Sequence, residues 1–148
     1  MHDVIIIGVG TSGLTVAYHL LKKGIQPLII DAAPNIASAW RRRHPQLSLN
    51  THRLLSNLPG MPIPKNKGTF VSRDDYISYL EDYASALQAE HQLDILFNTQ
   101  ITCIEPSNGQ WKLSSDKKHF SASNAIIATG PDRETYVPYW QGMENYKS

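Results

Sequence analysis

The chain has 148 residues, of which 41% are hydrophobic and 18% are charged, with a formal net charge of +1 and a single cysteine, Cys103. This composition predicts one domain with its own core, and it gives no general electrostatic attraction to nucleic acid or to an anionic membrane. One cysteine excludes an intramolecular disulfide and paired-thiol redox chemistry, so we expect a reducing, cytoplasmic location.

The first thirty residues have the pattern of strand, glycine turn, helix and strand. Residues 4–7 are an apolar β-branched run, typical of a strand buried on both faces in a parallel sheet and too short to span a membrane. A helix is predicted over about 13–23, with Gly24 at its end, and a second strand over 27–30.

Residues 32–72 are rich in Pro, Asn, Ser and Arg, and four prolines between 45 and 64 oppose regular structure. So long a stretch without secondary structure is uncommon in a compact domain unless it contacts a ligand, so we predict that it walls a binding site. A helix is predicted to follow, with Ser72 as its N-cap, Asp75 in its first turn and its end near Glu90.

The last third predicts a parallel strand over 94–97, a small antiparallel meander near 101–105, 110–114 and 119–121, and another buried strand over 125–128. Cys103 falls in the meander, where we expect a buried, inert thiol. The fold class predicted is α/β, a Rossmann-like parallel sheet with flanking helices plus a small antiparallel β-meander, in a single domain over 1–148.

Gly8, Gly10 and Gly13 form G-x-G-x-x-G directly between the first strand and the first helix, and Asp31 ends the next strand. The first glycine permits a tight turn, the second lets the backbone approach a pyrophosphate, and the third lets helix and strand pack closely. The helix start offers free N–H groups to phosphates, and Asp31 can accept hydrogen bonds from ribose hydroxyls. The pattern predicts a dinucleotide site at this helix start.

These residues leave the identity of the dinucleotide open. Asp31 disfavours NADP, because a 2′-phosphate would meet its carboxylate, so FAD and NAD both remain, as does a glycine turn without a ligand. The six histidines show no metal-ligand spacing, so no metal site is predicted. Arg42 and Arg43, in the basic run 41–43, are interpreted as a solvated face.

Further segments match a known family. They are residues 38–51 (SAWRRRHPQLSLNT), residues 58–64 (LPGMPIP), the predicted helix over 76–83, and residues 125–130 (AIIATG). In this order they resemble the FAD domain of the flavin-containing monooxygenases, a class of two-dinucleotide-binding-domain flavoproteins. The resemblance covers nearly the whole chain, as far as residues 136–145, which look like the family's link toward an NADPH domain.

The resemblance implies a set of FAD contacts. The glycine turn would hold the pyrophosphate, Trp40 and Arg41 the flavin region, and Ile101 the adenine, with Trp40 packing in the core as well. The cofactor-binding positions implied are Gly8, Gly10, Thr11, Ser12, Gly13, Asp31, Ala32, Trp40, Arg41, Thr51, Ile101, Thr129 and Gly130.

Asn50 falls where many members of the family place an active-site asparagine beside the oxygen-reacting edge of the flavin. A neutral amide there could orient an oxygen species by hydrogen bonding without titrating near neutral pH. The alternative is that Asn50 is a turn residue of the loop.

The activity that the resemblance implies is NADPH- and oxygen-dependent monooxygenation, with this chain supplying the FAD-binding part. The chain looks truncated before an NADPH domain, so it is expected to associate with itself or with a partner chain over the uncovered face. Whether the isolated chain is active or inactive is left open by the sequence. Two alternatives stay open, a non-catalytic module or remnant that binds FAD or another ADP-containing ligand, and an NAD-dependent dehydrogenase domain.

Overall fold

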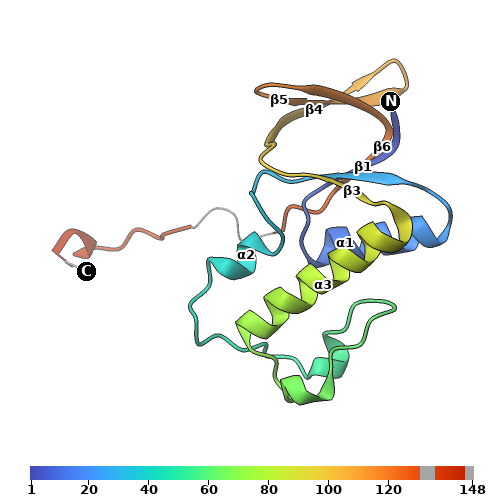
Figure 1. The fold of residues 1–148 in the computed structure, drawn as a ribbon. Coiled ribbons are helices and arrows are strands. Elements are labelled where there is room, and N and C mark those ends of the chain that lie inside the picture. Colours follow the sequence, from blue (N-terminus) through green and yellow to red (C-terminus); the bar gives the residue numbers. More distant parts are fainter. Residues whose placement is uncertain (131–135, 146–148) are drawn as a thin grey trace.

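The computed structural model describes residues 1–130 and 136–145, and its six strands form one sheet in the order β3-β2-β1-β6-β5-β4. Figure 1 shows α1 and α3 together on one side of the parallel strands, with β4 and β5 on the other side. The elements are β1 (His2–Ile7), α1 (Thr11–Lys22), β2 (Pro27–Ile30), α2 (Ser38–Arg41), α3 (Arg73–His91), β3 (Asp94–Leu96), β4 (Ile101–Ser107), β5 (Gln110–Ser115), β6 (His119–Ile127) and 3-10 turns at Arg53–Leu55, Lys65–Lys67 and Met143–Asn145. The predicted fold class is confirmed.

The parallel half of the sheet is centred on β1, which lies between β2 and β6. Ile7 at the end of β1 is opposite Ile30 of β2 and Ile127 of β6, and Ile30 is in turn opposite Leu96 of β3. The four strands therefore end along one edge of the sheet. Loops that follow parallel strands meet at such an edge, and ligands of open α/β sheets bind there.

The meander is part of this sheet and does not form a separate unit. Residues 119–121 and 125–128 were expected to be two strands, but residues 119–127 form the single strand β6. Its first half pairs antiparallel with β5, and Ala122 is opposite both Trp111 of β5 and His2 of β1. The expectation was wrong because the polar residues Ser121 and Ser123 interrupt the apolar pattern without interrupting the backbone pairing.

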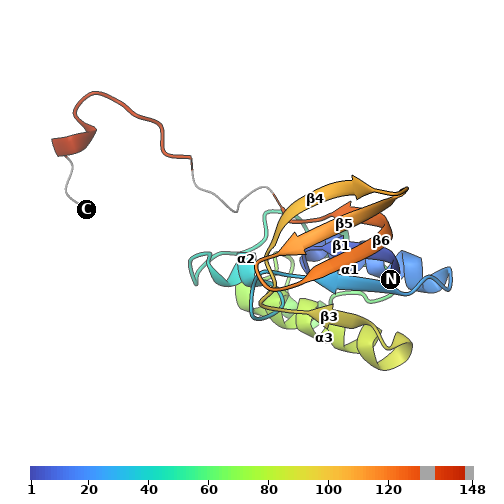
Figure 2. The same cartoon turned by 90° about the horizontal axis from the view of Figure 1, so that it is seen from above.

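Both faces of β1 are buried, as its sequence predicts. Ile6 is fully buried in the core between the sheet and the helices α1 and α3, with Leu14 of α1 and Leu80 of α3. Ile5 is fully buried on the opposite face in a second cluster with Leu113 of β5. Burial of each such side chain contributes about 1.5–3 kcal/mol, so the strand is fixed from both sides. Figure 2 shows the β4–β6 layer lying over β1 and α1.

The segment 32–72 is mainly irregular, as predicted, and its backbone is anchored at the start of α3. The Leu49 amide donates to the Val71 carbonyl at 2.8 Å, and the Arg73 amide donates to the Leu47 carbonyl at 2.7 Å. Ser72 is the N-cap of α3, and its hydroxyl accepts from the Asp75 amide at 3.2 Å. The predicted N-cap is therefore confirmed, and it sets where the segment meets the helix.

Two tyrosines of α3 hold the Pro-rich part of this segment against the helix. The Tyr79 hydroxyl accepts from the Leu58 amide at 2.6 Å and donates to the Met61 carbonyl at 2.6 Å. The Tyr83 hydroxyl donates to the Pro59 carbonyl at 2.7 Å. These bonds satisfy backbone groups of the segment that are buried or partly buried.

Cys103 was expected to be buried, but it is exposed, so this expectation is wrong. The residue lies on β4, which is the edge strand of the sheet and pairs only with β5. The pairing shifts between Ile101 and Cys103, as in a β-bulge. An edge position and a bulge leave a strand residue uncovered, and neither is visible in the local sequence.

Candidate dinucleotide site

A cleft of about 890 Å³ opens at the edge where the parallel strands end. Its walls include the residues that close β1, β2 and β6, namely Ile7, Ile30 and Ala128. The segment 32–72 supplies another wall, through α2 and residues 47–50. The prediction that this segment faces a site is in accord with this geometry. Of the 13 positions implied as cofactor contacts, all but Gly13 and Thr51 line the cleft, and so does Asn50.

The three glycines of the turn have different surroundings. Gly8 has φ +109°, and a Cβ on it would lie 2.4 Å from the Ala128 carbonyl oxygen. A Cβ on Gly13 would lie 2.0 Å from the Gly8 carbonyl oxygen. Both positions therefore need glycine for the fold itself. A Cβ on Gly10 would meet no described atom within 4 Å, so this glycine faces the open cleft.

The start of α1 presents backbone N–H groups to the cleft. Gly10 is the N-cap, and within the described residues no side chain caps the helix. Thr11 and Ser12 line the cleft, and the first bond of the helix joins the Leu14 amide to the Gly10 carbonyl at 3.0 Å. The N–H groups of an uncapped first turn and the positive end of the helix dipole favour an anion. A phosphate is the kind of group that this geometry accepts.

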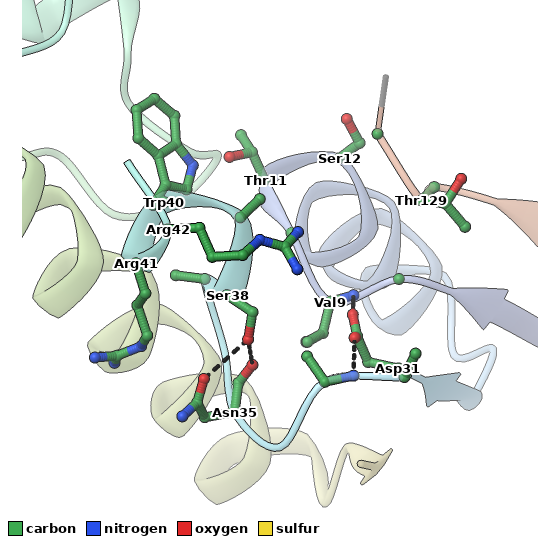
Figure 3. Close-up of a pocket in the computed structure, with 18 of the residues that line it drawn as sticks. Val9, Thr11, Ser12, Asp31, Asn35, Ser38, Trp40, Arg41, Arg42 and Thr129 are labelled. Atoms are coloured by element: carbon green, nitrogen blue, oxygen red, sulfur yellow. Dashed lines mark hydrogen bonds between the residues drawn. The ribbon is translucent and has the colours of Figure 1, made fainter. Parts of the chain in front are cut away.

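Asp31 is fixed in position by backbone amides on both carboxylate oxygens. Its Oδ2 accepts from the Val9 amide at 2.7 Å, and its Oδ1 accepts from the Ala33 amide at 2.8 Å. Figure 3 shows the carboxylate between these two amides, on the floor of the cleft. Each carboxylate oxygen has a further lone pair, so Asp31 can still accept from hydroxyl groups of a ligand. The bond to Val9 also ties the glycine turn to the end of β2.

The side chains of Arg41 and Arg42, at the end of the short helix α2, point in different directions. It begins after Ala37, which is buried and has φ +61°, and the Ser38 hydroxyl donates to the Asn35 carbonyl at 2.7 Å. The Arg41 guanidinium leaves the cleft and forms an ion pair with Glu81 of α3. Figure 3 shows the Arg42 side chain extended into the cleft. Arg42 is exposed, as expected for a solvated residue, and its side chain also points into the cleft.

Tyr76 of α3 packs against Trp40 and lies near Thr11. The ring centroids of Trp40 and Tyr76 are 5.0 Å apart in an edge-to-face arrangement, and Tyr76 is 4% exposed. Burial raises the pKa of Tyr76, and a hydrogen bond from the Thr11 side chain acts against this effect. The buried ring of Tyr76 thus supports Trp40, a cleft residue of α2. Trp40 packs against the core as expected.

The remaining predicted positions lie around the rim or outside it. Asn50 is exposed at the rim, and its side chain makes no hydrogen bond with any residue in 1–130 or 136–145. Thr51 lies outside the lining, and its hydroxyl is 2.6 Å from that of Ser56. Ile101, Thr129 and Gly130 line the cleft from the sheet side, with Ala32 after β2.

The lining residues that the sequence reasoning did not name as site residues include Thr99, Gln100, Ala128 and Arg42. Thr99 and Gln100 follow β3, and Ala128 follows β6, so their places after parallel strands were an available signal. For Arg42, nothing in a run of three arginines indicates which of them turns inward.

Within 1–130 and 136–145, no cluster of three His, Cys, Asp or Glu side chains is placed to hold a metal ion. In the same ranges, no helix has the length and apolar character needed to cross a membrane.

The fold and the cleft define an α/β domain of the dinucleotide-binding class, with a glycine turn, an uncapped helix start and an anchored carboxylate after the second strand. Residues 5–148 match the family model described as pyridine nucleotide-disulphide oxidoreductase, so the chain belongs to this family. The predicted resemblance to flavin monooxygenases is also confirmed by individual relatives.

A CzcO-like uncharacterized oxidoreductase from Geobacillus kaustophilus (strain HTA426) is 31% identical over 136 residues, which are 92% of this chain and 38% of that protein. A probable indole-3-pyruvate monooxygenase, YUCCA4 from Arabidopsis thaliana, is 30% identical over 145 residues, covering 96% of this chain and 34% of that protein. The solved flavin-containing monooxygenase from Stenotrophomonas maltophilia has 28% identity and a TM-score of 0.86, covering 99% of this chain and 44% of that chain. The chain thus spans well under half the length of these relatives.

Proposed function

We propose that the cleft binds FAD through its ADP half. The observation that supports this most strongly is the combination of the open Gly10 position, the uncapped start of α1 and the doubly anchored Asp31 in one cleft. The diphosphate would lie on the amides of Gly10, Thr11 and Ser12, and a ribose would lie at Asp31. The separate surroundings of the three glycines support this orientation.

The rest of the molecule would extend in both directions from the diphosphate. The adenine would lie along the strand ends near Ala32, Thr99 and Ile101, and the flavin would lie toward Trp40 and Thr129. Arg41 would contribute its backbone and stem to the wall, because its guanidinium is held by Glu81. Thr51 would act through the loop that it helps to fold, since its hydroxyl pairs with Ser56.

We further propose that the parent activity is NADPH- and oxygen-dependent monooxygenation, in line with the flavin monooxygenases among the relatives. Bound flavin would supply the oxidation–reduction chemistry. The chain's own residues would hold the dinucleotide, exclude water along the apolar wall formed by Trp40, and offer the Asn50 amide as a neutral hydrogen-bonding group at the rim. The NADPH-binding part of this activity is proposed to lie outside these residues.

A non-catalytic module that holds FAD or another ADP-containing ligand is the second candidate, because the open Gly10 position, the uncapped start of α1 and Asp31 all serve binding. NAD is the third candidate ligand, since Asp31 would accept from its ribose equally well. The long Pro-rich wall has no evident use in a plain NAD module.

We propose also that the chain is cytoplasmic. We propose that it associates with another chain through apolar side chains near its C-terminal end. Tyr136, Val137, Tyr139 and Trp140 are 87%, 56%, 82% and 53% exposed. Figure 1 shows this segment extending away from the sheet and helices. Exposed apolar groups of this kind favour contact with another chain. A clean monomer in light scattering at micromolar concentration would reject the proposal.

Purification of the chain tests the function. The expected result is a yellow protein that releases FAD on denaturation, or that binds added FAD with one site per chain. Oxygen consumption with NADPH would favour the monooxygenase, and a yellow but inert protein would favour the binding module. Release of NAD in place of FAD would overturn the proposed cofactor.

A further inference from the structure

The charges around the cleft bear on how it would hold a diphosphate. Asp31 brings a negative charge close to the glycine turn, and no residue of the first turn of α1 is charged. A diphosphate adds about two more negative charges, and like charges at short range repel one another. The helix dipole supplies only about half a positive charge, so a cation nearby would strengthen binding of the diphosphate.

Arg42 is the C-cap residue of α2, and its side chain extends into the cleft. Figure 3 shows its side chain pointing into the space between Thr11 and Val9. Its backbone amide donates to the Ser38 carbonyl at 3.3 Å, which keeps position 42 at the end of α2. Its side chain forms no hydrogen bond or ion pair with any other residue in 1–130 or 136–145.

The neighbouring arginine shows that this placement is not general for the run 41–43. The Arg41 guanidinium pairs with Glu81 and also donates from Nε to the Ile36 carbonyl at 3.2 Å, so it is committed to α3 and to its own loop. Arg42 therefore differs in having its donors free and directed at the cleft. A guanidinium presents a planar set of donors that matches the oxygens of a phosphate.

We propose that Arg42 binds the diphosphate of the dinucleotide from the side opposite to the start of α1. The inference rests on the proposed function and adds a specific contact to it. The diphosphate is held between the amides of Gly10, Thr11 and Ser12 and the Arg42 guanidinium. The arginine offsets the repulsion from Asp31, and it selects ligands by the diphosphate group itself. Adenosine, which has no phosphate, does not use this contact.

The test compares the 148-residue chain with Arg42→Gln and Arg42→Lys, by titration with FAD, ADP and adenosine. Lys23→Gln is the matched control, because it removes one positive charge from the opposite end of α1, where Lys23 is exposed. Circular dichroism and melting temperature should be nearly unchanged in all variants, since Arg42 is exposed and its side chain has no hydrogen bond or ion pair to lose within the described residues. This separates a binding effect from a folding effect.

The expected result for Arg42→Gln is a loss of FAD and ADP affinity by about 10- to 100-fold, as for a charge-assisted hydrogen bond. Adenosine affinity should be unchanged, and the dependence of ADP affinity on salt should become weaker. Arg42→Lys should retain part of the affinity, because it keeps the charge but not the planar donor set. Lys23→Gln should behave as the unmodified chain.

Two results would overturn the inference while leaving the proposed function in place. One is an Arg42→Gln chain that binds FAD and ADP as the unmodified chain does. The other is an equal loss of adenosine and ADP affinity, which would place the effect away from the diphosphate. If the unmodified chain binds neither FAD nor ADP, the proposed function fails, and the role of Arg42 fails with it.

Discussion

A Cβ atom on Gly13 would lie 2.0 Å from the carbonyl oxygen of Gly8. No described atom lies within 4 Å of a Cβ built on Gly10, in the same motif. Gly13 therefore permits α1 to pack against the end of β1, whereas Gly10 leaves room for something that the protein itself does not fill. The two glycines can be separated experimentally, one by stability and the other by ligand affinity.

Gly13→Ala is expected to lower the free energy of unfolding by about 3 kcal/mol or more, because the new methyl meets backbone that cannot move aside. Gly10→Ala is expected to change it by less than about 0.5 kcal/mol, since φ at Gly10 is −87° and the space is open. Gly10→Ala should nevertheless weaken FAD binding at least about tenfold. Urea denaturation and FAD titration measure the two effects, and a Gly10→Ala chain with full FAD affinity would contradict the placement of the diphosphate.

Asp31→Ala is expected to lower both stability and nucleotide affinity. It removes the acceptors of the Val9 and Ala33 amides, and each amide left without a partner costs about 1–3 kcal/mol. Asp31→Asn keeps one carbonyl acceptor and should be intermediate in stability. Thermal unfolding without ligand isolates the structural part, and an Asp31→Ala chain as stable as the original would show that these two hydrogen bonds do not matter.

The tyrosines of α3 predict a loss of stability at alkaline pH. Burial raises the pKa of Tyr79 and Tyr83 above the ordinary value of 10.0. In the unfolded chain each phenol loses its proton near pH 10, while the folded chain keeps it, so the folded state binds more protons there. The free energy of unfolding should therefore fall as pH rises above about 10, by up to about 1.4 kcal/mol per pH unit for each group.

Tyr83→Phe is the matched variant for this effect. At neutral pH it should lose about 1 kcal/mol, because the hydrogen bond to the Pro59 carbonyl is gone. Above pH 10 its stability should fall less steeply than that of the unmodified chain, because one titrating phenol has been removed. Parallel urea curves at neutral and alkaline pH check both statements, and identical slopes for the two chains would contradict the assignment to Tyr83.

Gln92→Gly is expected to stabilise the chain by about 0.5–1 kcal/mol. Gln92 is the C-cap of α3 and has φ +54°, a conformation that glycine adopts without the steric cost of a Cβ. Its side chain is exposed, and Gln26 bonds only to its backbone carbonyl, so little packing is lost. A lower melting temperature for Gln92→Gly would contradict this account of the helix end.

Features set by local chemistry could be predicted from the sequence. The β-branched run of β1, the glycine turn, the Ser72 cap and the Asn108–Gly109 turn, with φ of +50° and +76°, each lie where the residues indicate. The four-residue helix α2 was missed because it depends on Ala37 in a left-handed conformation, which alanine rarely adopts. The direction of the Arg42 side chain depends on where α2 lies in the fold, which the local sequence does not set.

Two other features depend on tertiary pairing in the same way. The exposure of Cys103 follows from the edge position of β4, and the continuity of β6 follows from its pairing with both β1 and β5. The amide partners of Asp31 come from the glycine turn and from its own loop, and these meet only when β1 and β2 pair in register. Local sequence patterns carry no information on contacts between segments that are far apart in the chain.

A crystal structure of the chain with FAD bound tests the central claim most directly. The account predicts that the diphosphate lies within hydrogen-bonding distance of the Gly10, Thr11 and Ser12 amides, with a ribose on the Asp31 carboxylate. FAD bound elsewhere, or bound in this cleft with the start of α1 left empty, would contradict it.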